Sequence, residues 1–301
     1  LEARLAGMFG MEAGLFFPSG TMANQTAIKL HTQPGEQLIA DKYAHVYNYE
    51  GGGVSFNSGV SCCLIDGDRG MITAEQVSGA INDPEFYHSP LTSLVCVENT
   101  TNKGGGACYD FNEFVKIRQV CDANNLKFHL DGARIWNALV ATNDNPKAYG
   151  KVFHTISVCL SKGLGAPIGS VLLSDKATIH KALRIRKILG GGMRQVGYLA
   201  AAGIYALDNN IERLSEDHRR AKELGKVLSK LPWVLKVEPV ETNILIFSVH
   251  PNVSEGLLLE KLKQKGISIS SMGQGKLRMV THLDYREVMH TYVLETLEKL
   301  T

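Results

Sequence analysis

Short apolar runs alternate with amphipathic, helix-like stretches along most of this chain of 301 residues. The runs are typical of buried strands and fall at 14–17, 37–40, 62–65, 93–97 and 127–130. Helical spacing of apolar residues marks the stretches at 21–31, at 73–77, where Thr73 is a suitable N-cap, and at 110–123. This alternation predicts an α/β fold with a mostly parallel sheet covered by helices on both faces.

Two chemically useful side chains follow successive predicted strands. Asp131 follows the run at 127–130, and Lys162 follows a run at 155–160 and is flanked by small residues. The carboxyl ends of parallel strands share one edge of a sheet, where active sites gather. A lysine amine can form a Schiff base with an aldehyde, and a carboxylate can keep a pyridine nitrogen protonated. A lone lysine is usually solvated and Asp-Gly is usually a turn, but together they predict a site for pyridoxal 5'-phosphate (PLP).

Ser19, Gly20 and Thr21 stand at a turn that opens a predicted helix, and they are expected at the same edge. The free backbone N–H groups and the positive end of the helix dipole suit a phosphate. An N-cap with a tight turn has the same geometry, so that plainer interpretation is compatible with phosphate binding.

The pattern of predicted elements changes after the three glycines at 190–192. Helical patterns run over 195–206 and 211–231, and strand-like runs follow at 234–237, 243–247 and 277–280. We therefore predict a large α/β domain over 1–207 and a smaller α+β domain over 208–301.

Composition narrows the functional classes. A formal net charge of +2 without a basic block argues against nucleic acid or an anionic membrane as partner, so we expect a small molecule. The six cysteines form no CxxC pair, which argues against a zinc cluster and a disulfide framework and favours a reducing cytoplasm. No metal-ligand cluster stands out. No apolar stretch approaches the roughly 20 residues that cross a bilayer, and the N-terminus lacks a signal-peptide layout.

Several motifs, in order, resemble the threonine aldolases of the fold type I PLP enzymes, close to the L-threonine and L-allo-threonine aldolase branch. The matching segments are FPSGTMAN at 17–24, AHVY at 44–47, VENT at 97–100, HLDGAR at 129–134, SKGLG at 161–165, GGGMRQ at 190–195 and RMVTHLD at 278–284. The likeness covers essentially the whole chain. It implies the fold type I architecture, PLP as cofactor, and a homo-oligomer, dimer or tetramer, with shared active sites.

The resemblance also implies roles for single residues. Lys162 corresponds to the Schiff-base lysine and Asp131 to the partner of the pyridinium nitrogen. The other correspondences are Ser19, Gly20 and Thr21 with the phosphate cradle, His45 with the residue stacked on the cofactor ring, Arg134 and Arg278 with the receptors of the substrate carboxylate, Arg194 with a phosphate ligand that reaches a neighbouring subunit, and His88 with a second active-site histidine. Without the resemblance, Arg134 and Arg278 could form structural salt bridges, His45 could start a helix, and His88 could be a surface residue.

The activity implied is PLP-dependent retro-aldol cleavage of L-threonine or L-allo-threonine to glycine and acetaldehyde. Either His45 or His88 could remove the proton of the β-hydroxyl, and the stereochemical preference stays open because it depends on about 1–3 kcal/mol in the pocket. Two departures stand out: family members carry a few dozen residues before the point where this chain starts, and Thr101 stands where the family more often has histidine. We expect Thr101 to have a modest effect on specificity or loop packing.

Three other functions are compatible with parts of the pattern. Another fold type I PLP enzyme, a β-eliminating lyase or an aminotransferase, would share Asp131 and Lys162. A catalytically silent PLP-binding protein would bind the cofactor without turnover. A nucleotide-binding α/β domain is the weakest of the three, because no GxGxxG follows the first predicted strand.

Overall fold

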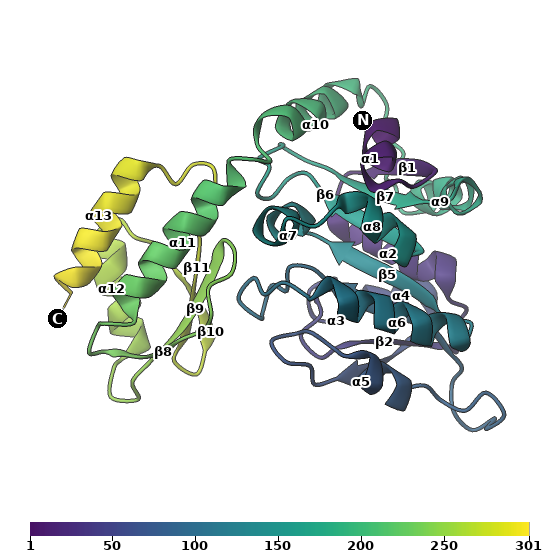
Figure 1. The fold of residues 1–301 in the computed structure, drawn as a ribbon, viewed down its shortest axis with the longest axis horizontal. Coiled ribbons are helices and arrows are strands. Elements are labelled where there is room, and N and C mark those ends of the chain that lie inside the picture. The colour runs from purple at the N-terminus through teal and green to yellow at the C-terminus, as the bar shows by residue number, and fades with distance from the viewer. Residues whose placement is uncertain (301) are drawn as a thin grey trace.

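A computed structural model describes residues 1–300 of the protein (Figure 1). A seven-stranded sheet forms the centre of its larger part. Its spatial order is β1-β7-β6-β5-β4-β2-β3. The strands are β1 (Ala13–Phe17), β2 (Gln37–Asp41), β3 (Ser61–Ile65), β4 (Thr92–Glu98), β5 (Lys127–Gly132), β6 (Thr155–Cys159) and β7 (Ser170–Ser174). The pairs among β2 to β6 are parallel, whereas β7 runs antiparallel to β6 and β1. The predicted mostly parallel sheet is confirmed.

The antiparallel strand β7 was not predicted from the sequence. The chain turns back directly after the loop that carries Lys162, and Gly169 permits the return with a φ of 123°. A Cβ atom at Gly169 would lie 2.5 Å from the Phe16 ring, so this crossing requires glycine. The loop is thereby held between two adjacent strands.

Helices cover both faces of this sheet because successive strand residues point to opposite sides. Leu38 and Leu94 pack beneath α2 and α4, whereas Ile39 and Val95 belong to the larger core beneath α1, α5, α6 and α8. The helices of this part are α1 (Glu2–Phe9), α2 (Gly20–His31), α3 (His45–Asn48), α4 (Gly53–Ser58), α5 (Ala74–Gly79), α6 (Phe111–Ala123), α7 (Ile135–Thr142), α8 (Pro146–Val152), α9 (Lys176–Ile188) and α10 (Gly197–Asn209). The predicted N-cap is confirmed, since the Thr73 hydroxyl accepts from Gln76 N and forms a capping box.

A second, antiparallel sheet of order β10-β11-β9-β8 lies toward the C-terminus (Figure 1). Its strands are β8 (Val234–Val237), β9 (Ile244–Val249), β10 (Ser270–Gly273) and β11 (Lys276–Val280), and its helices are α11 (Leu214–Leu228), α12 (Glu255–Gln264) and α13 (Glu287–Glu298). Helix α11 contributes Leu214 to the core of the larger part and Leu224 to the core of the smaller part. The division between 207 and 208 stays a prediction, because this helix packs in both cores.

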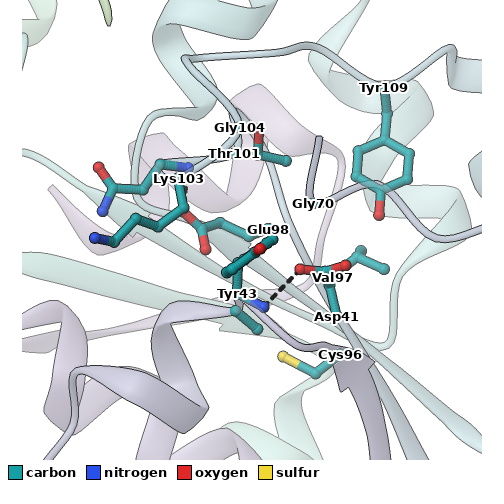
Figure 2. A pocket seen from close by; sticks show the side chains of 12 residues that line it. Asp41, Tyr43, Gly70, Cys96, Val97, Glu98, Thr101, Lys103, Gly104 and Tyr109 are labelled. Atoms are coloured by element: carbon teal, nitrogen blue, oxygen red, sulfur yellow. Dashed lines mark hydrogen bonds between the residues drawn. The ribbon is translucent and has the colours of Figure 1, made fainter. Parts of the chain in front are cut away.

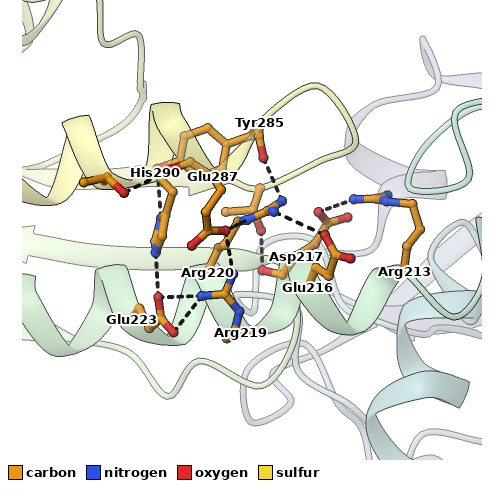
Figure 3. Close-up of polar contacts among 11 residues, drawn as sticks. Arg213, Glu216, Asp217, Arg219, Arg220, Glu223, Tyr285, Glu287 and His290 are labelled. Carbon is orange, nitrogen blue, oxygen red and sulfur yellow. Dashed lines mark hydrogen bonds and ion pairs between the residues drawn. The ribbon is translucent and has the colours of Figure 1, made fainter.

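Polar contacts join α11 to the segment that leads into α13 (Figure 3). The Arg220 guanidinium donates to the Tyr285 carbonyl oxygen at 2.8 Å, and His290 Nε2 lies 2.7 Å from Glu223 Oε2. These contacts join α11 to α13 and the segment before it. The smaller sheet carries Arg278 on β11. None of the helices within residues 1–300 is long and apolar enough to span a membrane.

Candidate active site

Asp131 lies near the carboxyl end of β5, the middle strand of the seven, and its side chain is buried. Its Oδ2 accepts a hydrogen bond from Asn24 Nδ2 at 2.9 Å, and its Oδ1 accepts from Ala133 N at 3.0 Å. Neutral donors stabilise a buried carboxylate without cancelling its charge. The carboxylate is therefore fixed by two hydrogen bonds at the edge where the sequence predicted the cofactor.

Lys162 reaches the same edge from the neighbouring strand. Asp131 pairs with Ser157 across β5 and β6, and the loop that holds Lys162 begins where β6 ends. The Lys162 side chain is exposed, as an amine that must meet a cofactor from solvent requires. The parallel topology thus brings Asp131 and Lys162 together as predicted, while their chemical roles stay predictions.

The start of α2 forms the third part of this edge. Ser19 is its N-cap, and the Ser19 hydroxyl accepts from Met22 N at 3.1 Å. A Cβ atom at Gly20 would lie 3.4 Å from Ser170 Oγ, and that buried hydroxyl has no hydrogen-bond partner among the described residues. Since a buried hydroxyl normally has a partner, the unpaired Ser170 and the open N–H groups near Gly20 and Thr21 fit the phosphate of PLP.

His45 begins α3, and its Nδ1 lies 2.9 Å from Glu50 Oε1. This hydrogen bond raises the pKa of His45. Glu50 Oε1 also accepts from Asn24 Nδ2 at 2.9 Å, so one amide connects Glu50 with Asp131. Ligand-type atoms of His45, Glu50 and Asp131 lie within 4.8 Å of one another. The Asn24 amide donates to both carboxylates, an arrangement that suits a hydrogen-bonded cofactor site better than a bare cation.

Arg134 and Arg278 converge from the two sheets. Arg134 stands before α7 in the larger part and Arg278 lies on β11 in the smaller part. Both guanidinium groups donate to Asn102 Oδ1, at 3.2 and 3.0 Å. Neither forms an ion pair within residues 1–300, and Arg278 Nε is buried without a partner there. The salt-bridge alternative is therefore not supported, and two cations around one neutral oxygen are arranged to receive an anion.

Glu98 lies behind this arrangement, in the lining of a small pocket with Asp41, Thr101 and Tyr109 (Figure 2). Its carboxylate accepts from His45 N at 3.1 Å and from Asn102 N at 2.8 Å. It therefore connects the segment that carries His45 with the loop that carries Asn102. Burial raises the pKa of Glu98 to about 7, and the negative charge of Asp131 adds to the rise.

We expect Glu98 to make stability depend on pH. Its pKa is about 7 in the folded protein and 4.5 in the unfolded chain, so between these values the folded state binds more protons. The free energy of unfolding should therefore fall as the pH rises from 4.5 to about 7. Glu98→Gln should lose this dependence, and urea denaturation at several pH values measures it. The exposed Glu85→Gln serves as control, and parallel pH curves for Glu98→Gln and the wild type would contradict the expectation.

The structure does not bring His88 to this edge within one chain. His88 lies in the loop before β4, at the amino end of that strand, whereas Asp131 and Lys162 lie at the carboxyl ends of β5 and β6. Its ring contacts Phe86 and Tyr87 and is exposed. The role of His88 as a second active-site histidine therefore stays a prediction, because parallel strands separate its loop from the site within one chain. A contribution from His88 would have to come from a neighbouring copy.

Arg194 lies on the exposed segment between α9 and α10. Nearby Gly191 packs so closely against α2 that a Cβ atom there would lie 2.2 Å from the Met22 sulfur. The segment therefore passes beside the start of α2, where the phosphate is expected. Whether Arg194 serves its own site or that of a neighbouring subunit stays a prediction.

Sequence reasoning missed the roles of five polar residues of the site: Asn24, Glu50, Glu98, Asn102 and Ser170. Asn24, Glu98 and Asn102 stand in or next to the motifs at 17–24 and 97–100, so their positions gave a signal although their roles did not. Glu50 and Ser170 follow from no such motif, because a glutamate after a short helix and a serine at the start of a strand are ordinary features.

Comparison with known proteins agrees with this geometry. The family described as beta-eliminating lyase matches residues 1–251. The chain is 37% identical over 290 residues to low-specificity L-threonine aldolase 1 of Arabidopsis thaliana, covering 94% of this chain and 80% of that one. It is 37% identical over 285 residues to the low specificity L-threonine aldolase of Escherichia coli (strain K12), covering 94% of this chain and 83% of that one.

A solved structure shares the fold. The threonine aldolase of Leishmania major superimposes with a TM-score of 0.84 at 19% identity, covering 98% of this chain and 87% of that one. The predicted fold type I PLP architecture is thereby confirmed. Extended identity to curated relatives and the family match over most of the chain show that this protein belongs to the beta-eliminating lyase family and, within it, to the PLP-dependent threonine aldolases.

Proposed function

We propose that this protein cleaves L-threonine and L-allo-threonine to glycine and acetaldehyde with PLP as cofactor. The observation that carries the proposal is the convergence of Arg134 and Arg278 on Asn102 Oδ1, close to the buried Glu98 that also contacts the His45 backbone. A bound PLP would supply an electron sink for the carbon left behind when the Cα–Cβ bond breaks. The unpaired Ser170 hydroxyl, the buried Asp131 carboxylate and the exposed Lys162 are the groups that would hold it.

The two arginines would bind the carboxylate of the amino acid and orient it. Burial lowers the pKa of Arg134, and Arg278 acts in the same direction while Glu98 opposes it. A guanidinium is planar and can form two parallel hydrogen bonds with one carboxylate, which suits both arginines to this task. A fixed carboxylate determines which bond of the α-carbon is presented for cleavage.

His45 is the residue that we propose to accept the proton of the β-hydroxyl. Its Nδ1 is engaged by Glu50, so in the neutral ring Nε2 is the free acceptor. His88 lies at the opposite end of the sheet in the same chain, which leaves His45 as the base available without a partner.

The test is acetaldehyde release from L-threonine and from L-allo-threonine by purified protein with added PLP. Release from either substrate above a Lys162→Ala blank supports the proposal, and the ratio of rates gives the stereochemical preference. Formation of a keto acid in place of acetaldehyde would instead indicate an aminotransferase or a β-eliminating lyase. PLP binding with neither product would indicate the silent binding protein.

Replacing Arg278 should weaken substrate binding more than it slows the chemical step. Arg278→Gln removes a charged donor group, and losing charge-assisted hydrogen bonds to a carboxylate corresponds to about 3 kcal/mol, or roughly a 100-fold higher KM. Steady-state kinetics with L-threonine measures it, with Arg286→Gln as an exposed control on the same unit. An unchanged KM would show that Arg278 does not hold the carboxylate.

We further propose a cytoplasmic homotetramer whose product contributes to glycine biosynthesis. All six cysteines are free, which suits a reducing compartment. Arg194 and His88 are both exposed, and a second copy offers a way for them to reach an active site. Sedimentation velocity with activity measured across the profile tests the assembly, and fully active monomers would contradict shared sites.

A further inference from the structure

A continuous chain of buried hydrogen bonds leads to Asp131 from the far end of α2. His31 Nε2, at the end of that helix, lies 3.1 Å from Thr155 Oγ1, and Thr155 Oγ1 lies 2.9 Å from His129 Nδ1. His129 Nε2 lies 3.2 Å from Asn24 Oδ1. Asn24, Thr155 and His129 are almost fully buried. These hydrogen bonds thus link His31 to Asn24, two turns apart on α2, through the buried side chains of Thr155 and His129.

The strand register explains why these groups meet. His129 and Asp131 are two residues apart on β5, and their partners Thr155 and Ser157 are two residues apart on β6. Side chains two residues apart on a strand share a face. Helix α2 lies over that face and contributes Asn24 and His31. The parallel strands β5 and β6 and the helix α2 therefore supply all residues of this hydrogen-bond network.

Only one orientation of the Asn24 amide satisfies these hydrogen bonds. Asn24 Nδ2 lies 2.9 Å from Asp131 Oδ2 and 2.9 Å from Glu50 Oε1, so the amide nitrogen must face the two carboxylates. Its oxygen then faces the Ser157 hydroxyl at 2.6 Å and His129 Nε2. A flipped amide would place its oxygen against two carboxylate oxygens.

The tautomer of His129 follows from the amide. Since Asn24 Oδ1 can only accept, His129 Nε2 carries the hydrogen and Nδ1 accepts from the Thr155 hydroxyl. Thr155 Oγ1 in turn accepts from His31 Nε2. Burial lowers the pKa of His129 to about 4 and that of His31 to about 3, so both rings are neutral at physiological pH.

We propose that His129 and Asn24 are positioning residues for the active site. His129 Nε2 and the Ser157 hydroxyl donate to the Asn24 amide oxygen and hold the amide in place, and Asn24 donates one hydrogen to Asp131 and the other to Glu50. Through these two carboxylates a single amide holds both the predicted partner of the ring nitrogen and the residue that binds His45.

The Asn24 hydrogen bond should also affect how Asp131 acts on the cofactor, an inference that rests on the proposed function. Asp131 accepts from Asn24 and from Ala133 N, so losing the Asn24 contact removes one of two hydrogen bonds that favour the ionised carboxylate. A weaker anion would keep the pyridine nitrogen less protonated. The chemical step should then slow, while the arginines that bind substrate stay in place.

The first experiment uses two-bond ¹⁵N–¹H correlation spectra of protein labelled with ¹⁵N-histidine, without and with PLP. The His129 signals are identified by their absence in His129→Gln. We expect the neutral Nε2–H tautomer of His129, unchanged between about pH 5.5 and 8. An Nδ1–H tautomer, or a ring that gains a proton in this range, would overturn the proposal whether or not the protein cleaves threonine.

The second experiment compares His129→Leu with His129→Gln, whose amide nitrogen can donate from about the position of Nε2. Losing a hydrogen bond to a group that supports a charge should lower kcat about tenfold or more in His129→Leu, with KM within about threefold of the wild type. His129→Gln should recover most of kcat, and both should bind PLP. Equal losses in the two variants, or an unchanged kcat in a folded His129→Leu, would overturn the positioning role.

Discussion

Lys162→Ala is expected to abolish covalent attachment of PLP and to lower acetaldehyde release by about 10³-fold or more, because this amine is the protein group proposed to bind the cofactor covalently. Borohydride reduction followed by mass spectrometry of the intact protein measures attachment directly. The wild type should gain the mass of the reduced cofactor, and the variant should not. Cofactor can still bind the variant non-covalently, so absorbance alone would not decide.

Lys103→Ala is the matched comparison for this experiment. Lys103 also follows a strand at the carboxyl edge of the sheet (Figure 2). Its Nζ lies 5.2 Å from the centre of the Tyr49 ring. It should keep attachment, since no motif assigns it a role. If reduction still labelled Lys162→Ala but not Lys103→Ala, the attachment site would be Lys103 and the assignment of Lys162 would be wrong.

Asp131→Ala is expected to leave attachment of PLP intact and to lower kcat by about 10³-fold, equivalent to about 4 kcal/mol of lost stabilisation of the developing charge. The carboxylate is buried and held by Asn24 and Ala133, so no water replaces it without rearrangement. Steady-state kinetics with L-threonine and borohydride reduction, performed on the same preparation, separate turnover from attachment.

Asp131→Asn separates charge from shape in this test. The amide has nearly the size of the carboxylate but no negative charge, so we expect a loss of turnover similar to that in Asp131→Ala. Near-normal turnover in Asp131→Asn would mean that another group keeps the ring nitrogen protonated. A loss only in Asp131→Ala would indicate that the cavity, not the charge, causes the defect.

The apolar pattern of the sequence predicted several strands that are buried on both faces. The runs at 37–40, 93–97 and 127–130 lie within β2, β4 and β5, because uninterrupted apolar sequence has few other solutions in a sheet covered by helices. Strands β7 and β10 were missed. Each is short and pairs antiparallel beside a glycine-containing turn, where local sequence carries little periodic signal.

The sequence by itself determined which groups could bind the cofactor and where they stand along the chain. A turn suited to phosphate comes first, then Asp131, then Lys162, and each follows a strand or opens a helix. Parallel strands place such positions at one edge, so this much needs no knowledge of packing. The tertiary structure alone decided the rest. Arg278 meets Arg134 only because the smaller sheet lies against the loop that carries Asn102. His88 lies away from this edge of its own chain because its loop is at the amino end of β4. Asn24 of α2 likewise binds Asp131 of β5 and Ser157 of β6, and each of these two residues lies more than 100 positions from Asn24 along the sequence. Contacts at such separation depend on packing that local patterns do not encode.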